Sequence, residues 1–311
     1  MEVQKTAVFL FGMPCSGKST WYEENKSKFR NFAYISADEI KKEFPDYDEA
    51  SLSMYNNEAI AIAEQRVQIA ADSGTHFIMD AGSINNNYTL RNIAYVKDRG
   101  YKVVMYHIDT PYHICIERNE KRNRKVPQEL IASKAFKKDY HWAKYERSEL
   151  VDETYVVPYY TEKHMFFDMD GVLAAQSSLP VVNGKIDFVN SNYFKYLPVV
   201  KQVQDIVKFI YEFKDREVYI LSAAPTSISM DEKKEWLEEN FPFIKKENIF
   251  FVNSGQYKAE MFNDLATRLK LDRKEMCLVE DTHHIIKSVQ RDYLMHSIHV
   301  SELLAKYGNY I

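Results

Sequence analysis

The sequence predicts an α/β protein built from two tandem domains, residues 1–157 and residues 158–311. Its 311 residues are too many for one ordinary hydrophobic core and suit two domains of ~150 residues. Short apolar segments alternate with amphipathic segments in two successive series, and a polar stretch that starts with a proline, residues 158–163, separates the two series. Strand–helix alternation of this kind makes a parallel sheet with helices on both faces.

The elements of the first series follow from apolar runs and from helical spacing of apolar residues. We expect strands at residues 6–11, 32–36, 75–81, 102–108 and 154–157. We expect helices from about residue 18 and at residues 59–71, 88–99, 111–123 and 127–147.

The second series repeats the alternation. We expect strands at residues 164–168, 217–222, 248–252 and 275–279. We expect helices at residues 199–214, 231–240, 257–269 and 283–291.

Composition narrows the class of protein. A formal charge of -4, with 45% hydrophobic and 28% charged residues, is typical of a globular protein and argues against a basic nucleic-acid coat protein. No apolar run approaches the ~20 residues of a membrane span, and the first residues resemble a buried strand more than a signal peptide. Three widely spaced cysteines fit a reducing compartment, so we expect a cytoplasmic protein.

A phosphate-binding loop follows the first predicted strand. Residues 12–20, GMPCSGKST, match G-x-x-x-x-G-K-[ST] between an apolar strand and a helix. Backbone N–H groups of such a loop surround phosphate oxygens, and Lys18 reaches the β- and γ-phosphates while Ser19 binds Mg²⁺. We therefore expect ATP and Mg²⁺ as cofactors. The expected nucleotide-binding residues are Gly12, Ser16, Gly17, Lys18, Ser19 and Thr20.

Two carboxylates lie where they face the same crevice as the loop. Asp38 follows the second predicted strand, and the carboxyl ends of parallel strands meet at one edge of the sheet. We expect Asp38 to be the general base for an acceptor hydroxyl and Lys41 to bind an acceptor phosphate; alternatively, Asp38 is only a helix N-cap. Asp80 ends a strand and is expected to bind the acceptor or a metal-bound water.

A basic run covers residues 118–125, RNEKRNRK, with five cations and one acid. Arg118 and Arg122 are four residues apart, which predicts that they share one face of a helix. We expect a lid whose arginines contact the transferring phosphates, with Arg118 binding ATP and Arg122 catalytic. The alternative is a solvated helix end.

The second domain opens with an apolar strand that ends in D-x-D-G-V-L, residues 168–173. Paired carboxylates at a strand end divide two tasks: Asp168 attacks phosphorus, and Asp170 protonates the leaving oxygen and later activates water. Mg²⁺ relieves their repulsion. Polar residues follow in order at two later strand ends and at one helix start. Ser222 can donate a hydrogen bond to the phosphate, Lys258 can balance the charge of the nucleophile, and Glu280 with Asp281 can complete a metal site with Asp168 and Asp170.

This second pattern resembles the opening of the haloacid-dehalogenase superfamily of phosphatases. The resemblance implies a Rossmann-like domain after the P-loop kinase sheet. Because the insert between Leu173 and Pro198 is short, we expect only a small cap over the site. A site with little cover admits large substrates or polymer ends.

The combination of the two patterns resembles the phage-type polynucleotide 5′-kinase/3′-phosphatase family, over nearly the whole chain. The resemblance implies ATP-dependent phosphorylation of 5′-OH ends and Mg²⁺-dependent removal of 3′-phosphates. It further implies RNA or DNA ends as substrates and a ligase acting in the same pathway. No membrane association is expected, and homo-oligomer formation is left open.

Two departures from that family keep alternatives open. Lys41 stands where the family has arginine, and Ser222 is followed by Ala-Ala-Pro where the family has Gly-Arg. The S-A-A-P segment is similar to the deoxynucleotidase branch of the same superfamily. A nucleoside or nucleotide kinase fused to a nucleotidase is therefore the main alternative, and a nucleotide-sensing module without turnover is the third.

Overall fold

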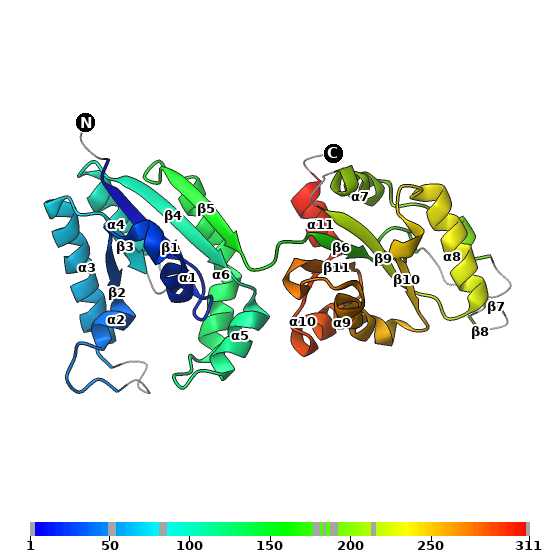
Figure 1. The fold of residues 1–311 in the computed structure, drawn as a ribbon, viewed down its shortest axis with the longest axis horizontal. Coiled ribbons are helices and arrows are strands. Elements are labelled where there is room, and N and C mark those ends of the chain that lie inside the picture. The colour runs from blue at the N-terminus through cyan, green and yellow to red at the C-terminus, as the bar shows by residue number, and fades with distance from the viewer. Residues whose placement is uncertain are drawn as a thin grey trace. The chain divides into compact units, whose positions relative to one another are not determined.

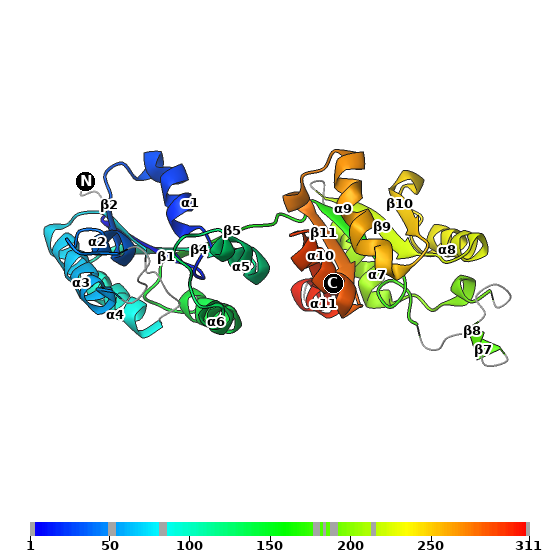
Figure 2. The same ribbon diagram turned by 90° about the horizontal axis from the view of Figure 1, so that it is seen from below.

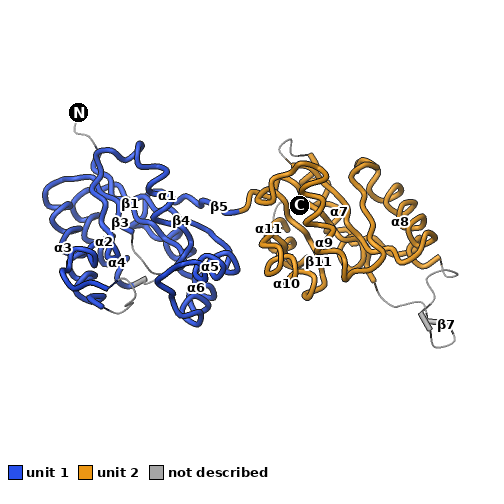
Figure 3. The backbone as a smooth tube through the Cα atoms, turned by 60° about the horizontal axis from the view of Figure 1, so that its bottom comes forward, with its two compact units in different colours: residues 1–159 blue, residues 160–311 orange. Residues whose placement is uncertain are grey.

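The structure is a computed structural model that describes residues 4–48, 54–80, 86–176, 181–182, 185–186, 192–212 and 216–308. The chain divides into two compact units, Met1–Tyr159 and Tyr160–Ile311 (Figure 3). The division falls two residues after the predicted boundary. The reason is local, since Pro158 still pairs with Asp109 and the Tyr159 N–H donates to the Asp109 carbonyl at 3.0 Å.

The sheet of unit 1 has five parallel strands in the order β2-β3-β1-β4-β5 (Figure 1). The strands are β1 Thr6–Phe11, β2 Ala33–Ser36, β3 Phe77–Asp80, β4 Lys102–Asp109 and β5 Glu153–Pro158. β1 is central and almost entirely buried, which explains its uninterrupted apolar sequence.

Helices cover both faces of this sheet (Figure 2). They are α1 Lys18–Asn25, α2 Ala37–Lys41, α3 Asn56–Ser73, α4 Asn86–Lys97, α5 Tyr112–Glu120 and α6 Gln128–Glu146, with a 3₁₀ turn at Lys26–Phe29. Alternate residues of β1 divide between two cores: Phe9 packs with α3, α4 and α6, whereas Leu10 packs with Tyr22 of α1 on the opposite face.

Unit 2 repeats the design with a second parallel five-stranded sheet, in the order β10-β9-β6-β11-β12. The strands are β6 His164–Phe167, β9 Glu217–Ala223, β10 Ile249–Val252, β11 Met276–Glu280 and β12 His296–His299. A separate two-stranded antiparallel sheet joins β7 Val181–Val182 and β8 Lys185–Ile186.

The helices of unit 2 also occupy both faces of their sheet (Figure 1). They are α7 Lys201–Glu212, α8 Ser227–Asn240, α9 Lys258–Leu269, α10 His283–Asp292 and α11 Val300–Tyr307. The 3₁₀ turns are Phe194–Tyr196, Lys246–Asn248, Gly255–Tyr257 and Arg273–Glu275. α7, α8 and α11 pack in one core, and α9 and α10 pack in the other.

The predicted small cap falls only partly within the described residues. Residues 177–180, 183–184 and 187–191 lie outside them. The described end of the insert is attached to α8, because the Phe194 N–H donates to the Glu232 carboxylate at 3.1 Å and Trp236 Nε1 donates to the Leu197 carbonyl at 2.7 Å. The last residue of the predicted strand 75–81 and the last two residues of the predicted helix 199–214 also lie outside the described residues.

Two predicted α/β series with parallel sheets are confirmed, whereas several elements differ. The elements α2, β7, β8, β12 and α11 were not predicted from the sequence. β12 is an edge strand whose residues, HSIH, lack an apolar run. α8 begins four residues earlier than predicted because Thr226 and Ser229 form a capping box at its start. Among the described residues, no helix has both the length and the apolar character of a membrane span.

Candidate active sites

The phosphate loop of unit 1 connects β1 to α1. Cys15 and Gly17 have positive φ angles of 63° and 95°, which turn the backbone tightly before the helix begins. Lys18 is buried, and its ammonium donates to the carbonyl oxygens of Gly12 at 3.3 Å and Met13 at 3.2 Å. These contacts hold the cation against the backbone of the loop.

Ser19 and Asp80 meet at the carboxyl edge of the sheet. The Ser19 hydroxyl donates to Asp80 Oδ2 at 3.2 Å, and the Tyr34 hydroxyl donates to the same oxygen at 3.3 Å. Burial and the adjacent Asp80 carboxylate raise the pKa of Tyr34 well above its usual value, so it stays a donor. A hydroxyl and a carboxylate are the hard oxygen ligands that Mg²⁺ prefers, so this pair fits the predicted ion.

Asp38 lies in α2, in an ion-pair cluster that the sequence did not predict. Its Oδ1 accepts from both terminal nitrogens of Arg124 at 3.2 Å, and the Lys41 ammonium lies 3.5 Å away. Burial opposes ionisation, but these two cations hold the pKa of Asp38 below its usual value. Ser36, not Asp38, occupies the N-cap position of α2, so the N-cap alternative for Asp38 is wrong.

The arginines of the basic run contact the phosphate loop by different routes. Arg118 Nη1 donates to the carbonyl oxygens of Ser16 at 2.9 Å and Cys15 at 3.3 Å. Arg122 Nη1 lies 3.3 Å from Cys15 Sγ. The φ of 95° favours glycine at residue 17, and a Cβ there would also lie 3.1 Å from Arg118 Nη1, so the guanidinium would have to shift slightly.

The prediction that Arg118 and Arg122 share one helix face is wrong, because α5 ends at Glu120. The Asn119 side chain closes a loop instead. Its amide donates to the Val126 carbonyl and its oxygen accepts from the Val126 N–H, both at 2.8 Å. This local pairing competes with continued helix and carries the chain back toward α6.

A single pocket of about 1730 Å³ brings most of the predicted residues of unit 1 together. They are Gly17, Lys18, Ser19, Thr20, Asp38, Lys41, Asp80, Arg118 and Arg122. Gly12 and Ser16 do not line it. Ser16 is buried, and its hydroxyl has no hydrogen-bond partner among the described residues. The volume exceeds the ~300–1,000 Å³ of an ordinary small-molecule pocket, so it has room for two substrates.

The central group of unit 2 is a buried triad at the carboxyl edge of its sheet. The Lys258 ammonium, at the first residue of α9, lies 2.7 Å from Asp168 Oδ2 and 2.7 Å from Glu280 Oε2. All three side chains are almost completely buried. Burial and the charge of Asp168 raise the pKa of Glu280 to about 8, even though Lys258 opposes the shift.

Asp281 completes a carboxylate cluster with Asp168 and Glu280, and their oxygens lie within 4.8 Å of one another. Such a set of hard oxygens fits Mg²⁺. Gly171, with a φ of 75°, makes room for it, because a Cβ there would lie 2.1 Å from Asp281 Oδ2. The glycine of the D-x-D-G motif is therefore required by the position of the adjacent carboxylate as well as by its backbone angle.

Lys233, for which the sequence predicted no role, contacts both Asp170 and Ser222. The Lys233 ammonium pairs with Asp170 Oδ2 and donates to Ser222 Oγ at 3.0 Å and to the Ala223 carbonyl at 2.6 Å. Burial raises the pKa of Asp170, and the charge of Asp168 adds to it, while Lys233 opposes both. A lysine within a charged helix such as α8 carries no recognisable signal in the sequence.

The family model matches unit 1 alone, whereas the similar solved structures cover either about half or nearly all of the chain. Residues 8–138 match the model of a family described as an AAA domain. The chain is also similar to a chain of the Pnkp1/Rnl/Hen1 RNA repair complex, with 16% identity over 96% of each chain and a TM-score of 0.41. Another similar chain belongs to the PezAT chromosomal toxin–antitoxin system of Streptococcus pneumoniae, with 18% identity over 49% of this chain and 68% of that chain and a TM-score of 0.41.

A third similar structure is the tunicamycin resistance protein of Deinococcus radiodurans, with 14% identity over 50% of this chain and 87% of that chain and a TM-score of 0.35. The family match and the loop between β1 and α1 define unit 1 as a kinase-like P-loop domain, a class that binds ATP. The chain as a whole joins this domain to a second α/β unit with its own parallel sheet.

Proposed function

We propose that the protein is a bifunctional enzyme that heals nucleic-acid ends, phosphorylating 5′-OH ends in unit 1 and removing 3′-phosphates in unit 2. The observation that supports the proposal is that each unit has its own cluster of charged side chains at the carboxyl edge of a parallel sheet. Unit 1 has one large pocket that contains both the phosphate loop and Asp38. Unit 2 has the buried group formed by Asp168, Lys258 and Glu280.

In unit 1, the loop and Lys18 hold the β- and γ-phosphates of ATP, and the Ser19 and Asp80 side chains would hold Mg²⁺. The ion supplies neutralisation of charge on the phosphates when bound. Asp38, ionised because of its two cationic neighbours, accepts the proton of the 5′-hydroxyl as that oxygen bonds to the γ-phosphorus. The bond to the β-phosphate oxygen breaks, and ADP leaves.

The arginines of unit 1 act on the charge that develops during this transfer. Arg118 already lies against the loop carbonyls, so it needs little movement to contact phosphate oxygens. Arg122 borders the same pocket and approaches from the loop that follows α5. Because guanidinium groups do not deprotonate, they stabilise phosphoryl charge throughout the reaction.

In unit 2, Asp168 attacks the phosphorus of the terminal 3′-phosphate, and the bond to the ribose oxygen breaks. Asp170 gives its proton to that leaving oxygen, which its raised pKa favours. An aspartyl-phosphate on Asp168 remains. Asp170, now ionised, takes a proton from water as that water attacks phosphorus and releases inorganic phosphate.

The supporting residues of unit 2 hold this constellation together. Asp168, Glu280 and Asp281 would hold Mg²⁺, which supplies charge neutralisation for the nucleophile and the phosphate when bound. Lys258 balances the charge of Asp168. Lys233 lies beside Ser222 and supplies a positive charge there. The Ala-Ala-Pro segment that follows Ser222 has no cationic side chain that could do so.

The proposal is tested by offering each unit a polymer end and its mononucleotide counterpart. Unit 1 should transfer the γ-phosphate of ATP to a 5′-OH oligonucleotide in preference to nucleosides. Unit 2 should release phosphate from an oligonucleotide 3′-phosphate in preference to deoxynucleoside monophosphates. A strong preference for mononucleotides in both assays would replace end healing with the nucleotide kinase and nucleotidase alternative.

A further inference from the structure

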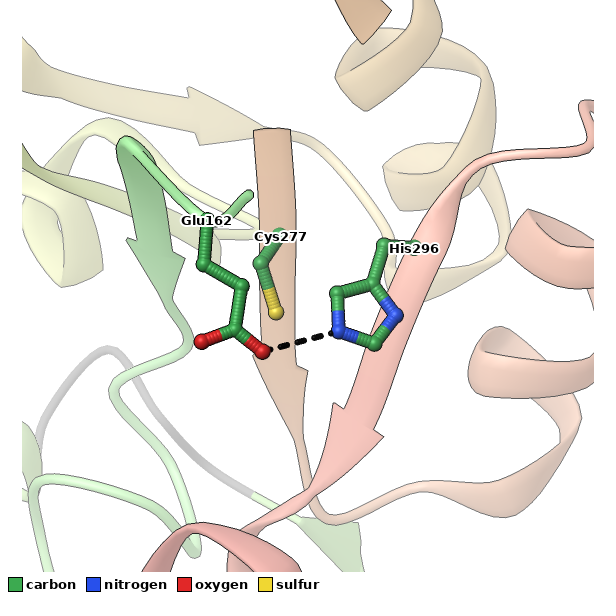
Figure 4. Close-up of side chains that lie close together, drawn as sticks. All are labelled: Glu162, Cys277 and His296. Carbon is green, nitrogen blue, oxygen red and sulfur yellow. Dashed lines mark hydrogen bonds and ion pairs between the residues drawn. The ribbon is translucent and has the colours of Figure 1, made fainter. Parts of the chain in front are cut away.

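A second group of potential ligands lies at the opposite edge of the unit 2 sheet from Asp168. Glu162 precedes β6 by two residues, Cys277 is the second residue of β11, and His296 is the first residue of β12 (Figure 4). These three strands are neighbours in the sheet order, so their amino ends bring the three side chains together. The catalytic carboxylates follow the carboxyl ends of the same strands, so the two clusters are separate.

The three side chains converge on one point. Their ligand atoms, a carboxylate oxygen, a thiol sulfur and an imidazole nitrogen, lie within 4.8 Å of one another. In Figure 4 the Cys277 sulfur points toward the space between the Glu162 carboxylate and the His296 ring. Glu162 and Cys277 are buried, whereas the His296 side chain is 18% exposed and leaves a route from solvent.

Neighbouring residues fix the orientation of two of these side chains. The Glu162 carboxylate uses Oε2 for the Lys306 ammonium at 2.6 Å and turns Oε1 toward His296 Nε2 at 3.0 Å. The His296 ring stacks on Tyr160, with centroids 4.7 Å apart and planes at 14°. Groups that orient the ligands in this way are a regular part of protein metal sites.

The chemistry of this donor set selects a class of ion. Thiolate and imidazole are ligands for Zn²⁺ and similar borderline ions, whereas Mg²⁺ requires oxygen. Binding needs the deprotonated thiol and a neutral imidazole with its proton on Nδ1, so the thiol proton is released. The Lys306 charge offsets one oxygen of Glu162 but leaves Oε1, the oxygen nearest His296, for the ion.

We propose that Glu162, Cys277 and His296 form a binding site for a thiophilic divalent cation, with Zn²⁺ the best fit. The ion ties the first residues of unit 2 to the amino edge of its sheet. Without such an ion, the same residues make only a polar cluster in which the buried Glu162 carboxylate pairs with Lys306 and hydrogen-bonds to His296. The two interpretations differ in one respect that can be measured, namely whether the Cys277 sulfur bonds to a metal.

The test uses the full-length, chelator-stripped protein in a non-chelating reductant. Excess Mg²⁺ is present to fill oxygen-only sites such as the one around Asp281. Co²⁺ is titrated as a spectroscopic substitute for Zn²⁺, because only a thiolate ligand gives an intense sulfur-to-cobalt charge-transfer band in the near ultraviolet. The variants are Cys277→Ser, His296→Gln and the control Cys115→Ser, which removes an equally buried thiol from unit 1.

We expect the wild-type and Cys115→Ser proteins to show the band, with saturation at one equivalent of Co²⁺. Cys277→Ser should lose it, and His296→Gln should weaken Zn²⁺ binding by about tenfold or more. Zn²⁺ should also raise the thermal midpoint of the wild type but not that of Cys277→Ser. If Cys277→Ser does not fold, as judged by circular dichroism, the Zn²⁺ affinities of His296→Gln and Cys115→Ser are compared instead.

Two results would overturn the inference. One is a wild-type protein that shows no thiolate band with one equivalent of Co²⁺. The other is an unchanged band in Cys277→Ser or, where that variant does not fold, a Zn²⁺ affinity of His296→Gln equal to that of Cys115→Ser. Neither readout depends on kinase or phosphatase turnover, so the inference stands or fails independently of the proposed function.

Discussion

The candidate site of unit 1 is open and assembled from segments far apart in the sequence, whereas the charged centre of the unit 2 site, formed by Asp168, Lys258 and Glu280, is closed to solvent. Asp38 lines the pocket, where neighbouring atoms partly desolvate its carboxylate, yet its side chain remains 58% exposed. It is held by Arg124, which comes from the loop after α5. The side chains of Asp168, Lys258 and Glu280 are at most 5% exposed. This difference agrees with the two proposed reactions, because a kinase must admit two substrates whereas the nucleophile of a phosphatase needs to meet only one phosphate.

The strongest test of that comparison exchanges one residue in each site. We expect Lys18→Ala to lower 5′-kinase turnover by at least about 10²-fold while 3′-phosphatase activity stays near wild type, because each site is built from residues of its own compact unit. Asp168→Asn should have the opposite effect, because an amide cannot form the aspartyl-phosphate. Both rates are measured on the same preparations. Loss of both activities in either folded variant would show that the two sites do not act separately.

The closed site of unit 2 should be the less tolerant of added volume. Gly171→Ala places a Cβ on Asp281 Oδ2, so we expect the Mg²⁺ concentration for half-maximal phosphatase activity to rise by about tenfold. Gly255→Ala is the control within unit 2. A Cβ at Gly255 would lie 3.6 Å from Ile285 Cδ1, an ordinary contact, so this variant separates the contact with Asp281 from a general effect of an added methyl group in this unit. Equal phosphatase activity in the two variants would contradict the predicted role of Asp281.

The arginines of unit 1 give a smaller expected effect. Arg122→Lys should lower kinase turnover by about tenfold without changing the thermal midpoint, because lysine loses the planar fork that binds phosphoryl oxygens. Lys125→Arg in the same basic run is the control, because it alters the shape of a side chain while its charge stays the same. Kinase turnover should change little in this variant. Wild-type turnover in Arg122→Lys would instead favour the alternative that the basic run is a solvated helix end.

The sequence predicted what depends on local pattern and missed what depends on distant partners. Apolar runs identified the buried strands, and the edge strand β12 was missed because histidines take the place of apolar residues. The loop and the D-x-D-G motif were visible because their residues are adjacent in the chain. Arg124 bonds to Asp38 across 86 residues and Lys233 to Asp170 across 63, so neither contact left a local signal.

The contact between Arg124 and Asp38, which the sequence did not predict, leads to the prediction with the smallest expected effect. Arg124 and Lys41 hold the pKa of Asp38 below its usual value against the effect of burial, so the carboxylate remains ionised well into the acid range. If ionised Asp38 accepts the proton of the 5′-hydroxyl, kinase activity falls as pH drops through that pKa. Arg124→Gln removes the larger of the two favourable charges, and the pKa of Asp38 rises.

The acid limb of the kinase pH–rate profile should therefore move to higher pH in Arg124→Gln, with the plateau rate less affected than the limb. Arg122→Gln is the matched control, because Arg122 Nη1 contacts Cys15 Sγ and not the Asp38 carboxylate. Its limb should stay in place even if its plateau falls. The measurement is initial rate against pH at saturating ATP and 5′-OH oligonucleotide. An unmoved limb in Arg124→Gln would mean that Asp38 is not the titrating base, and the open site of unit 1 would then rely on positioning alone.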